Sequence, residues 1–288
     1  MARLDISALS LRFGGVRALR EVTFSVADRA LVAIIGPNGA GKTSLLNCVS
    51  GVYRPQAGRV LLDGEDVTPL RPHQRARRGL ARTFQNLGLF KGLTVLENLL
   101  VGRHTHLKTG ILAGGFFLGK GRREELLQRQ KMQELLDFLE IGEHAQKLTG
   151  TLSYGLQKRV ELGRALALEP RLLLLDEPMA GMNAGEKTKM ARLILELNEK
   201  RGITIAMIEH DIGVVMDLSH RICVLDFGEK IAEGTPLEVR RDAKVQAAYL
   251  GAALWSFSFN SRSTDWSSVA STPWSRSGSS SSTNRAAS

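Results

Sequence analysis

The stretch GPNGAGKT, at residues 36–43, constrains the fold of this chain more than any other feature. It follows ALVAIIG (30–36), a short continuous apolar run that is typical of a strand buried on both faces. It leads into TSLLNCVSG (43–51), where apolar residues recur at helical spacing up to a glycine. A strand, a glycine-rich turn and a helix in this order match the pattern G-x-x-x-x-G-K-[ST], whose backbone N–H groups and helix N-terminus bind phosphate. We therefore predict a phosphate-binding loop.

This loop supplies the predicted contacts to a nucleotide. Lys42 would reach the β- and γ-phosphates, and the hydroxyl of Thr43 would bind Mg²⁺. Kinases, GTPases, motors and transporters share such a loop, so it indicates the ligand class and not yet the function. The predicted nucleotide-binding residues of the loop are Gly36, Pro37, Asn38, Gly39, Ala40, Gly41, Lys42, Thr43 and Ser44.

A second motif, LLLLDEP (172–178), narrows the choice. A buried strand that ends in Asp176 places one carboxylate near Mg²⁺, and Glu177 beside it could orient or deprotonate an attacking water. Two acidic residues at the end of a strand also occur as a pair that caps the next helix. Together with the glycine loop, the pair indicates nucleotide hydrolysis.

The remaining pattern predicts an α/β fold. The apolar run at 202–210 indicates a further buried strand, and strands that alternate with helices form a mainly parallel sheet covered on both sides. Alternating stretches at 3–28, 58–67 and 222–234 predict antiparallel hairpins. Residues 91–168 are mostly helical in pattern. We therefore expect an inserted helical subdomain and a small antiparallel β subdomain beside the main sheet.

Composition points to a protein that works in the cytosol. The N-terminus MARLDISALS lacks the apolar core of a secretory signal, and the longest uncharged apolar run, residues 110–119, is about half of what a bilayer span needs. Cys48 and Cys223 lie in apolar patterns and are expected to be reduced and buried.

The net charge of +10 comes without a compact basic block that carries aromatics, which argues against nucleic acid as a partner. Basic runs at 71–78 and 120–123 are either solvated or lie against membrane headgroups.

The C-terminal segment differs from the rest in composition. Residues 256–288 hold fourteen serines and no apolar periodicity, which predicts disorder. The three tryptophans of the chain lie in or beside this segment, which is unusual for a disordered tail and suggests a reading-frame slip or a fused sequence after Gly251. We therefore place the folded domain at 4–251 and a Ser-rich tail at 252–288.

Several short motifs occur in one order within residues 4–251. They are Phe13, GPNGAGKT, Gln85 in RTFQN, LSYGLQ (152–157), LLLLDEP, AGMN (180–183) and His210 in IEHD. As a set they resemble the ATP-binding subunits of ABC transporters. The resemblance implies a P-loop NTPase core, a helical subdomain at about 89–157, and ATP with Mg²⁺ as cofactors.

The resemblance also implies roles for single residues. Phe13 would stack on adenine, and Gln85 would sense the γ-phosphate and Mg²⁺. His210 would hold the γ-phosphate and the attacking water. Taken singly, Phe13 could instead be a core residue, and Gln85 and His210 could make polar surface contacts. The predicted catalytic residues are Glu177, His210 and Gln85, and the predicted metal ligands are Thr43, Gln85 and Asp176.

The stretch LSYGLQKR departs from the common spelling of the family signature, which has Gly where Tyr154 stands and Gln where Leu156 stands. In the family this segment begins a helix and faces the nucleotide held by the other subunit. That task needs a hydroxyl, which Ser153 supplies, and exposed N–H groups at a helix N-terminus, which Gly155 leaves open to close approach. We predict a working signature formed by Ser153, Gly155 and Gln157. The alternative is a helix that begins at a capping serine without a ligand.

A longer similarity points to one group within the family. The chain resembles the larger of the two ATPases of branched-chain amino acid importers in RTFQN, LTVLENLLVG, EPMAGMN and the stretch from IEHDIGVVMDL to VQAAYLG. This resemblance implies an energy-coupling subunit bound to transmembrane permease subunits at the cytoplasmic face of the inner membrane. Its further partners would be a second ATP-binding subunit, homologous or identical, and indirectly a periplasmic or extracellular solute-binding protein.

Three alternatives stay open on sequence grounds. An ATPase of the same family could drive transport of another solute or export of lipopolysaccharide, because the solute contacts other subunits. A soluble, non-transport ABC ATPase for DNA repair would carry very long coiled coils, whereas 67 residues separate Gln85 from Ser153, and ribosomal members carry two ATPase halves in one chain. A P-loop kinase would leave Ser153, Gly155 and His210 unexplained.

Overall fold

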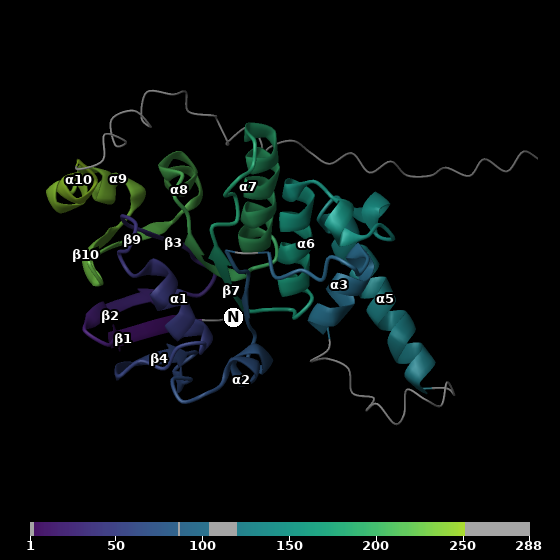
Figure 1. Cartoon of the computed structure of the whole chain (residues 1–288), viewed down its shortest axis with the longest axis horizontal. Coiled ribbons are helices and arrows are strands. Elements are labelled where there is room, and N and C mark those ends of the chain that lie inside the picture. Colours follow the sequence, from purple (N-terminus) through teal and green to yellow (C-terminus); the bar gives the residue numbers. More distant parts are fainter. Residues whose placement is uncertain (1–2, 86, 104–119, 251–288) are drawn as a thin grey trace, which may run out of the picture.

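The structure, a computed structural model, describes residues 3–85, 87–103 and 120–250 (Figure 1). The strands are β1 (Leu4–Phe13), β2 (Val16–Val26), β3 (Leu31–Ile35), β4 (Ala57–Leu62), β5 (Glu65–Asp66), β6 (Leu80–Arg82), β7 (Leu172–Asp176), β8 (Thr204–Ile208), β9 (Arg221–Asp226) and β10 (Glu229–Gly234). The helices are α1 (Lys42–Ser50), α2 (Pro72–Arg77), α3 (Val95–Gly102), α5 (Lys120–Phe138), α6 (Tyr154–Leu166), α7 (Ala184–Glu199), α8 (Ile212–Leu218), α9 (Pro236–Arg241) and α10 (Ala243–Leu250), with short 3₁₀ turns at Gly142–His144 and Thr149–Thr151.

A six-stranded sheet in the order β10-β9-β3-β8-β7-β6 is the core of the fold. Its neighbours pair in parallel, except for β10, which adds an antiparallel edge to β9. Every residue of β3, β7 and β8 is buried, as continuous apolar runs predict. Along β7, Leu173 and Leu175 pack toward α3, α5, α6 and α7, whereas Leu172 and Leu174 pack toward α1 and the antiparallel strands. The predicted α/β fold with a mainly parallel sheet is confirmed.

A four-stranded sheet in the order β2-β1-β4-β5 is the predicted antiparallel part. β1 and β2 pair along their length up to Phe13 and Val16, and β4 pairs with the other edge of β1. The apolar face of this sheet packs on α1, so that Ile6 and Leu45 belong to the same core as β3. As a result, the turn of the β1–β2 hairpin lies beside the start of α1.

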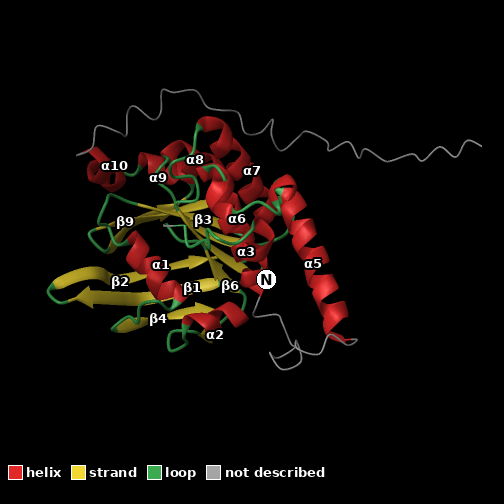
Figure 2. Cartoon of the chain, turned by 45° about the vertical axis from the view of Figure 1, so that its right-hand side comes forward, coloured by secondary structure: helices red, strands yellow, loops and turns green. Residues whose placement is uncertain are grey.

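The helices α3, α5 and α6 pack together through Leu99, Leu136 and Val160. In Figure 2, α5 lies on the opposite side of the molecule from the β1–β2 hairpin. The subdomain limit predicted at residue 157 falls within α6, and the division of the chain into subdomains stays a prediction.

Some expectations from the sequence concern residues outside the described ranges. They are the Ser-rich tail at 252–288 and the apolar run at 110–119.

Cys48 and Cys223 are both buried free thiols, as predicted. Across the ranges that the structure describes, no helix has both the length and the apolar character that crossing a bilayer requires.

Candidate nucleotide site

The glycine loop turns from the end of β3 into the start of α1, as the sequence predicts. Gly41, the residue before α1, has a φ of 99°, and a Cβ there would lie 2.5 Å from the carbonyl oxygen of Ala18. At Gly36, a Cβ would lie 2.0 Å from the carbonyl oxygen of Leu225. The loop therefore passes between β2 and β9 in a space that admits no side chain at these two positions.

Lys42 begins α1 and folds back onto its own loop. Its ammonium nitrogen donates to the carbonyl oxygens of Gly36 at 2.7 Å and Pro37 at 2.9 Å, and 6 % of the residue is exposed. Burial lowers the pKa of Lys42, and the carboxylates of Glu177 and Asp176 act in the opposite direction. The loop thus holds a positive charge at its base, where a bound phosphate would meet it.

The loop forms one wall of an open cavity of about 550 Å³. Gln85, Glu177 and His210 line the same cavity and come from three separate segments of the chain. The sequence predicts these three as catalytic, and the structure brings them together. The loop residues that line the cavity are Asn38, Gly39, Ala40, Gly41, Lys42, Thr43 and Ser44.

Two hairpin turns that sequence reasoning did not place in the site complete the cavity. The β9–β10 turn contributes Phe227, which has a φ of 44° and is 77 % exposed. The sequence predicts both hairpins, but it carries no signal that their tips meet the glycine loop. The β1–β2 turn and the residues after it contribute Gly15, Val16, Arg17, Ala18 and Arg20.

Glu177 occupies strained backbone just after β7. Its φ is 50°, in the left-handed region that residues other than glycine rarely adopt, and such strain is concentrated at functional sites. Its two carboxylate oxygens have different partners. The ring nitrogen Nε2 of His210 lies 2.8 Å from Oε1, and the side-chain amide of Gln85 donates to Oε2 at 3.2 Å. The carboxylate is therefore held facing the cavity, as a base that deprotonates a water must be.

Asp176, the last residue of β7, is buried beside an arginine that sequence reasoning missed. Arg82 Nη2 donates to Asp176 Oδ2 at 2.9 Å, and its Nη1 donates to the side chains of Asn47 and Ser50 on α1. The other carboxylate oxygen, Oδ1, is buried and has no hydrogen-bond partner among the described residues. A buried carboxylate oxygen without a partner is costly, so this atom is suited to meet a ligand.

Phe13, the predicted adenine-stacking residue, ends β1 near this cavity and is not among the residues that line it. Its ring packs edge-on to Tyr53, with the ring centroids 5.1 Å apart, and 47 % of the residue is exposed. Val16, directly across the hairpin from Phe13, does line the cavity. Stacking of Phe13 on adenine stays a prediction.

The predicted signature residues lie at the start of α6 and do not line the cavity of their own chain. Ser153 is the N-cap residue, and its hydroxyl accepts a hydrogen bond from the N–H of Leu156 at 3.4 Å. The side chain of Gln157 donates to the carbonyl oxygen of Leu152 at 2.9 Å. The start of the helix is therefore capped by Ser153, and a role of these residues toward a second subunit's nucleotide stays a prediction.

Tyr154 and Leu156, which depart from the common signature, both have packing partners in the same chain. Tyr154 covers Gly181, where a Cβ would lie 3.0 Å from the tyrosine ring, and the ammonium of Lys158 lies 5.9 Å from the ring centroid. Leu156 packs against the apolar core to which Leu99, Leu136 and Val160 belong.

The space that a side chain at Gly155 would fill is occupied by Glu186 of the same chain. A Cβ on this residue would lie 2.3 Å from Oε1 of Glu186, near the start of α7. A side chain at this position would have to displace Glu186, a contact that the sequence alone did not reveal.

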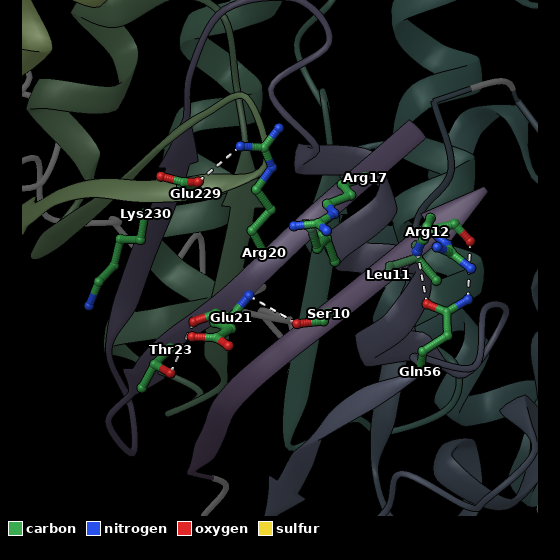
Figure 3. A pocket seen from close by; sticks show the side chains of 11 residues that line it. Ser10, Leu11, Arg12, Arg17, Arg20, Glu21, Thr23, Gln56, Glu229 and Lys230 are labelled. Carbon is green, nitrogen blue, oxygen red and sulfur yellow. Dashed lines mark hydrogen bonds and ion pairs between the residues drawn. The ribbon is translucent and has the colours of Figure 1, made fainter. Parts of the chain in front are cut away.

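A second hollow, of about 760 Å³, lies along the β1–β2 hairpin and the start of β10 (Figure 3). Two of its four basic side chains are paired with carboxylates, Arg20 with Glu229 at 3.1 Å and Lys230 with Glu233 at 2.7 Å. It shares Arg17 and Arg20 with the cavity of the glycine loop. None of the predicted site residues lines it, so the candidate chemistry belongs to the smaller cavity.

Comparison with known proteins identifies the family. The family model described as "ABC transporter" matches residues 19–180, more than half of the chain. The chain belongs to the ABC transporter family. A shorter model, described as "Branched-chain amino acid ATP-binding cassette transporter", matches residues 229–254.

Relatives of this ABC protein match over nearly their whole length. It is 43 % identical over 250 residues to the high-affinity branched-chain amino acid transport ATP-binding protein BraF of Pseudomonas aeruginosa, a match that covers 87 % of this chain and 98 % of that protein. It is 41 % identical, with the same coverage, to the corresponding protein LivG of Salmonella typhimurium. A solved structure of an ATP-binding cassette of an ABC transporter in its ADP conformation is 34 % identical, with a TM-score of 0.76 over 87 % of this chain and 99 % of that one. The chain is therefore an ABC ATPase, which binds and hydrolyses ATP.

Proposed function

We propose that this ABC ATPase is the energy-coupling subunit of an importer of branched-chain amino acids. The family match at 229–254 and the identities of 43 % and 41 % to BraF and LivG support this solute class. The observation that carries the catalytic part is the position of Glu177, held between Gln85 and His210 beside the glycine loop.

In this proposal the phosphates of ATP lie along the N–H groups of the loop, with Lys42 at the β- and γ-phosphates. Water attacks the γ-phosphorus, the bond from that phosphorus to the oxygen that bridges it to the β-phosphate breaks, and ADP leaves. The proton of the water passes to the carboxylate of Glu177. Gln85 and His210 each hold one oxygen of that carboxylate, so little freedom is lost when the water binds. A base positioned in this way contributes to the rate through both its basicity and its orientation.

The residues present also fit Mg²⁺. The hydroxyl of Thr43, the side-chain oxygen of Gln85 and the unpartnered Oδ1 of Asp176 are oxygen donors, which this ion prefers. We propose these three residues as its ligands. When bound, the ion would neutralise charge that develops on the phosphate oxygens.

Permease subunits would dock on the apolar surface beside Gln85. Phe84 and Phe90 are 43 % and 52 % exposed, and Leu148 is 49 % exposed. Two backbone hydrogen bonds join the segments of Phe90 and Leu148, since the N–H of Thr149 donates to the carbonyl oxygen of Leu93 and the N–H of Gly150 donates to that of Lys91. Exposed large apolar side chains on adjoining segments mark a protein contact. Docking there places the chain at the cytoplasmic face of the inner membrane, with a periplasmic or extracellular solute-binding protein as an indirect partner.

A second ATP-binding subunit, homologous or identical, would complete each nucleotide site. Its Ser153, Gly155 and Gln157 would meet the nucleotide bound by the first subunit. This assignment is supported by the position of these residues at a helix start, where N–H groups lack helical partners, and by their absence from the cavity of their own chain.

The test is reconstitution of the chain with its permease subunits and solute-binding protein in liposomes. We expect leucine with the binding protein to stimulate ATP hydrolysis and to be taken up, and Lys42→Ala to abolish both. Stimulation by lipopolysaccharide or by another solute, with no response to leucine, would refute the import of branched-chain amino acids and leave the ATPase assignment standing.

A further inference from the structure

The helix α6 holds the segment that carries Gln85. Glu161, in the middle of α6, is 2 % exposed, and its Oε1 accepts a hydrogen bond from the N–H of Phe84 at 3.0 Å. One turn further along, Arg164 donates to the carbonyl oxygen of Gly88. The backbone before and after Gln85 is therefore tied to the same helix.

Glu161 is also linked to the start of α6. The ammonium of Lys158 lies 3.6 Å from its Oε2, and both side chains are 2 % exposed. The same ammonium lies 5.9 Å from the ring centroid of Tyr154, the first residue of the helix. Burial raises the pKa of Glu161, whereas the N–H of Phe84 and the charge of Lys158 act in the opposite direction. A buried ion pair of this kind is weak evidence that Glu161 serves stability, so the position of Glu161 indicates a different role.

We propose that Glu161 is a positioning residue for ATP hydrolysis, because by holding the N–H of Phe84 it keeps Gln85 at Glu177. This inference rests on the proposed roles of Gln85 and Glu177. The contacts run from Tyr154 through Lys158 to Glu161 and on to the N–H of Phe84, next to Gln85. They therefore connect the start of α6, which would face the partner's nucleotide, with the catalytic base in the nucleotide site of the same chain. A shift of α6 on binding that second nucleotide would then move Gln85. A double-mutant cycle measures the coupling along this line of contacts.

The experiment measures kcat and KM for ATP in the assembled transporter. Glu161→Met keeps the bulk and removes the acceptor, and we expect kcat to fall about 10-fold with KM within about twofold, because the glycine loop is untouched. Glu161→Gln keeps an oxygen for the N–H of Phe84 and should restore kcat to within about threefold of the parent. In a Gln85→Ala background, Glu161→Met should cause no further loss of kcat, because it acts through Gln85.

Asn198→Leu is the matched control. Asn198 is a buried polar residue of α7 whose side-chain amide donates to the carbonyl oxygens of Arg29 at 2.8 Å and Ile203 at 2.9 Å, and we expect its loss to lower the melting temperature and leave kcat unchanged. A parent-like kcat for Glu161→Met, or an equal loss in both backgrounds, would overturn the inference alone. If Gln85→Ala and Glu177→Gln hydrolyse ATP at the parent rate, the catalytic assignment fails and the inference fails with it.

Discussion

Gly155 offers a test of how the helix α6 is seated. It is the second residue of α6, and a Cβ on it would lie 2.3 Å from Oε1 and 2.5 Å from Cδ of Glu186. Gly155→Ala must therefore displace Glu186. That side chain is not free to move, since its Oε2 accepts a hydrogen bond from the N–H of Asn183 as half of the capping box that begins α7.

The expected magnitude follows from opposing contributions to the free energy of unfolding. Loss of this half of the capping box removes about 1 kcal/mol, the typical effect of a helix cap. Crowding between α6 and α7 removes about 1 kcal/mol more. Replacing a glycine by alanine within a helix adds about 1 kcal/mol in the other direction. We therefore expect Gly155→Ala to destabilise the domain by about 1 kcal/mol, which lowers the melting temperature by about 2–4 °C.

Gly185→Ala is the matched control for this substitution. Gly185 is the second residue of α7, and a Cβ there meets only Oδ1 of Asn183, at the ordinary distance of 3.5 Å. The same change at the same helical position should therefore stabilise the chain by up to about 1 kcal/mol. In a double-mutant cycle, Glu186→Ala should remove the penalty of Gly155→Ala, with a coupling energy of about 1–2 kcal/mol.

Thermal unfolding followed by circular dichroism measures the stability of each variant, and ATP hydrolysis is measured on the same preparations. A penalty for Gly155→Ala that persists beside Glu186→Ala would refute the contact between α6 and α7 as its cause. If hydrolysis is lost in both backgrounds while stability is kept, the glycine serves the approach of a ligand, and contact with Glu186 is not the reason for a glycine at this position.

Two further predictions concern the catalytic base and the thiols. Glu177→Gln keeps the side chain between Gln85 and His210 and removes its basicity, so ATP binding should persist while single-turnover phosphate release slows by about 10²-fold or more. Release at the parent rate would remove Glu177 from this role. Burial raises the pKa of Cys48 to about 11 and that of Cys223 to about 12, so at pH 8 both thiols stay protonated in the native chain and a thiol reagent should label them only after unfolding. Rapid labelling of the native chain would contradict this placement.

The fold could be predicted because its main signals are local. A strand buried on both faces needs a continuous apolar run, which is why β3, β7 and β8 are readable along the chain. The turn at Phe227 and Gly228 is also local, since both residues have positive φ and join antiparallel strands. Each prediction of this kind depends on neighbours in sequence, and tertiary packing agrees with it.

The site was less readable because its contacts are not local. The contact between Gln85 and Glu177 joins residues 92 positions apart, and only the sheet topology brings them together. The pairing of Arg82 with Asp176 spans 94 positions and leaves no periodic pattern. Gly155 is predicted to leave room for a ligand, and its contact with Glu186 of the same chain is a second feature that no sequence pattern indicates.

Packing within the chain accounts for the tyrosine that stands in the signature where the family commonly has glycine. A glycine in place of Tyr154 would leave Gly181 uncovered and would remove the ring beside Lys158. Lys158 in turn pairs with Glu161, which holds the segment of Gln85. The tyrosine therefore stands at one end of a set of contacts that reaches the proposed catalytic site, while the capping hydroxyl of the signature is unchanged. A substitution that strengthens contacts within the chain and keeps the capped helix start is compatible with a working signature.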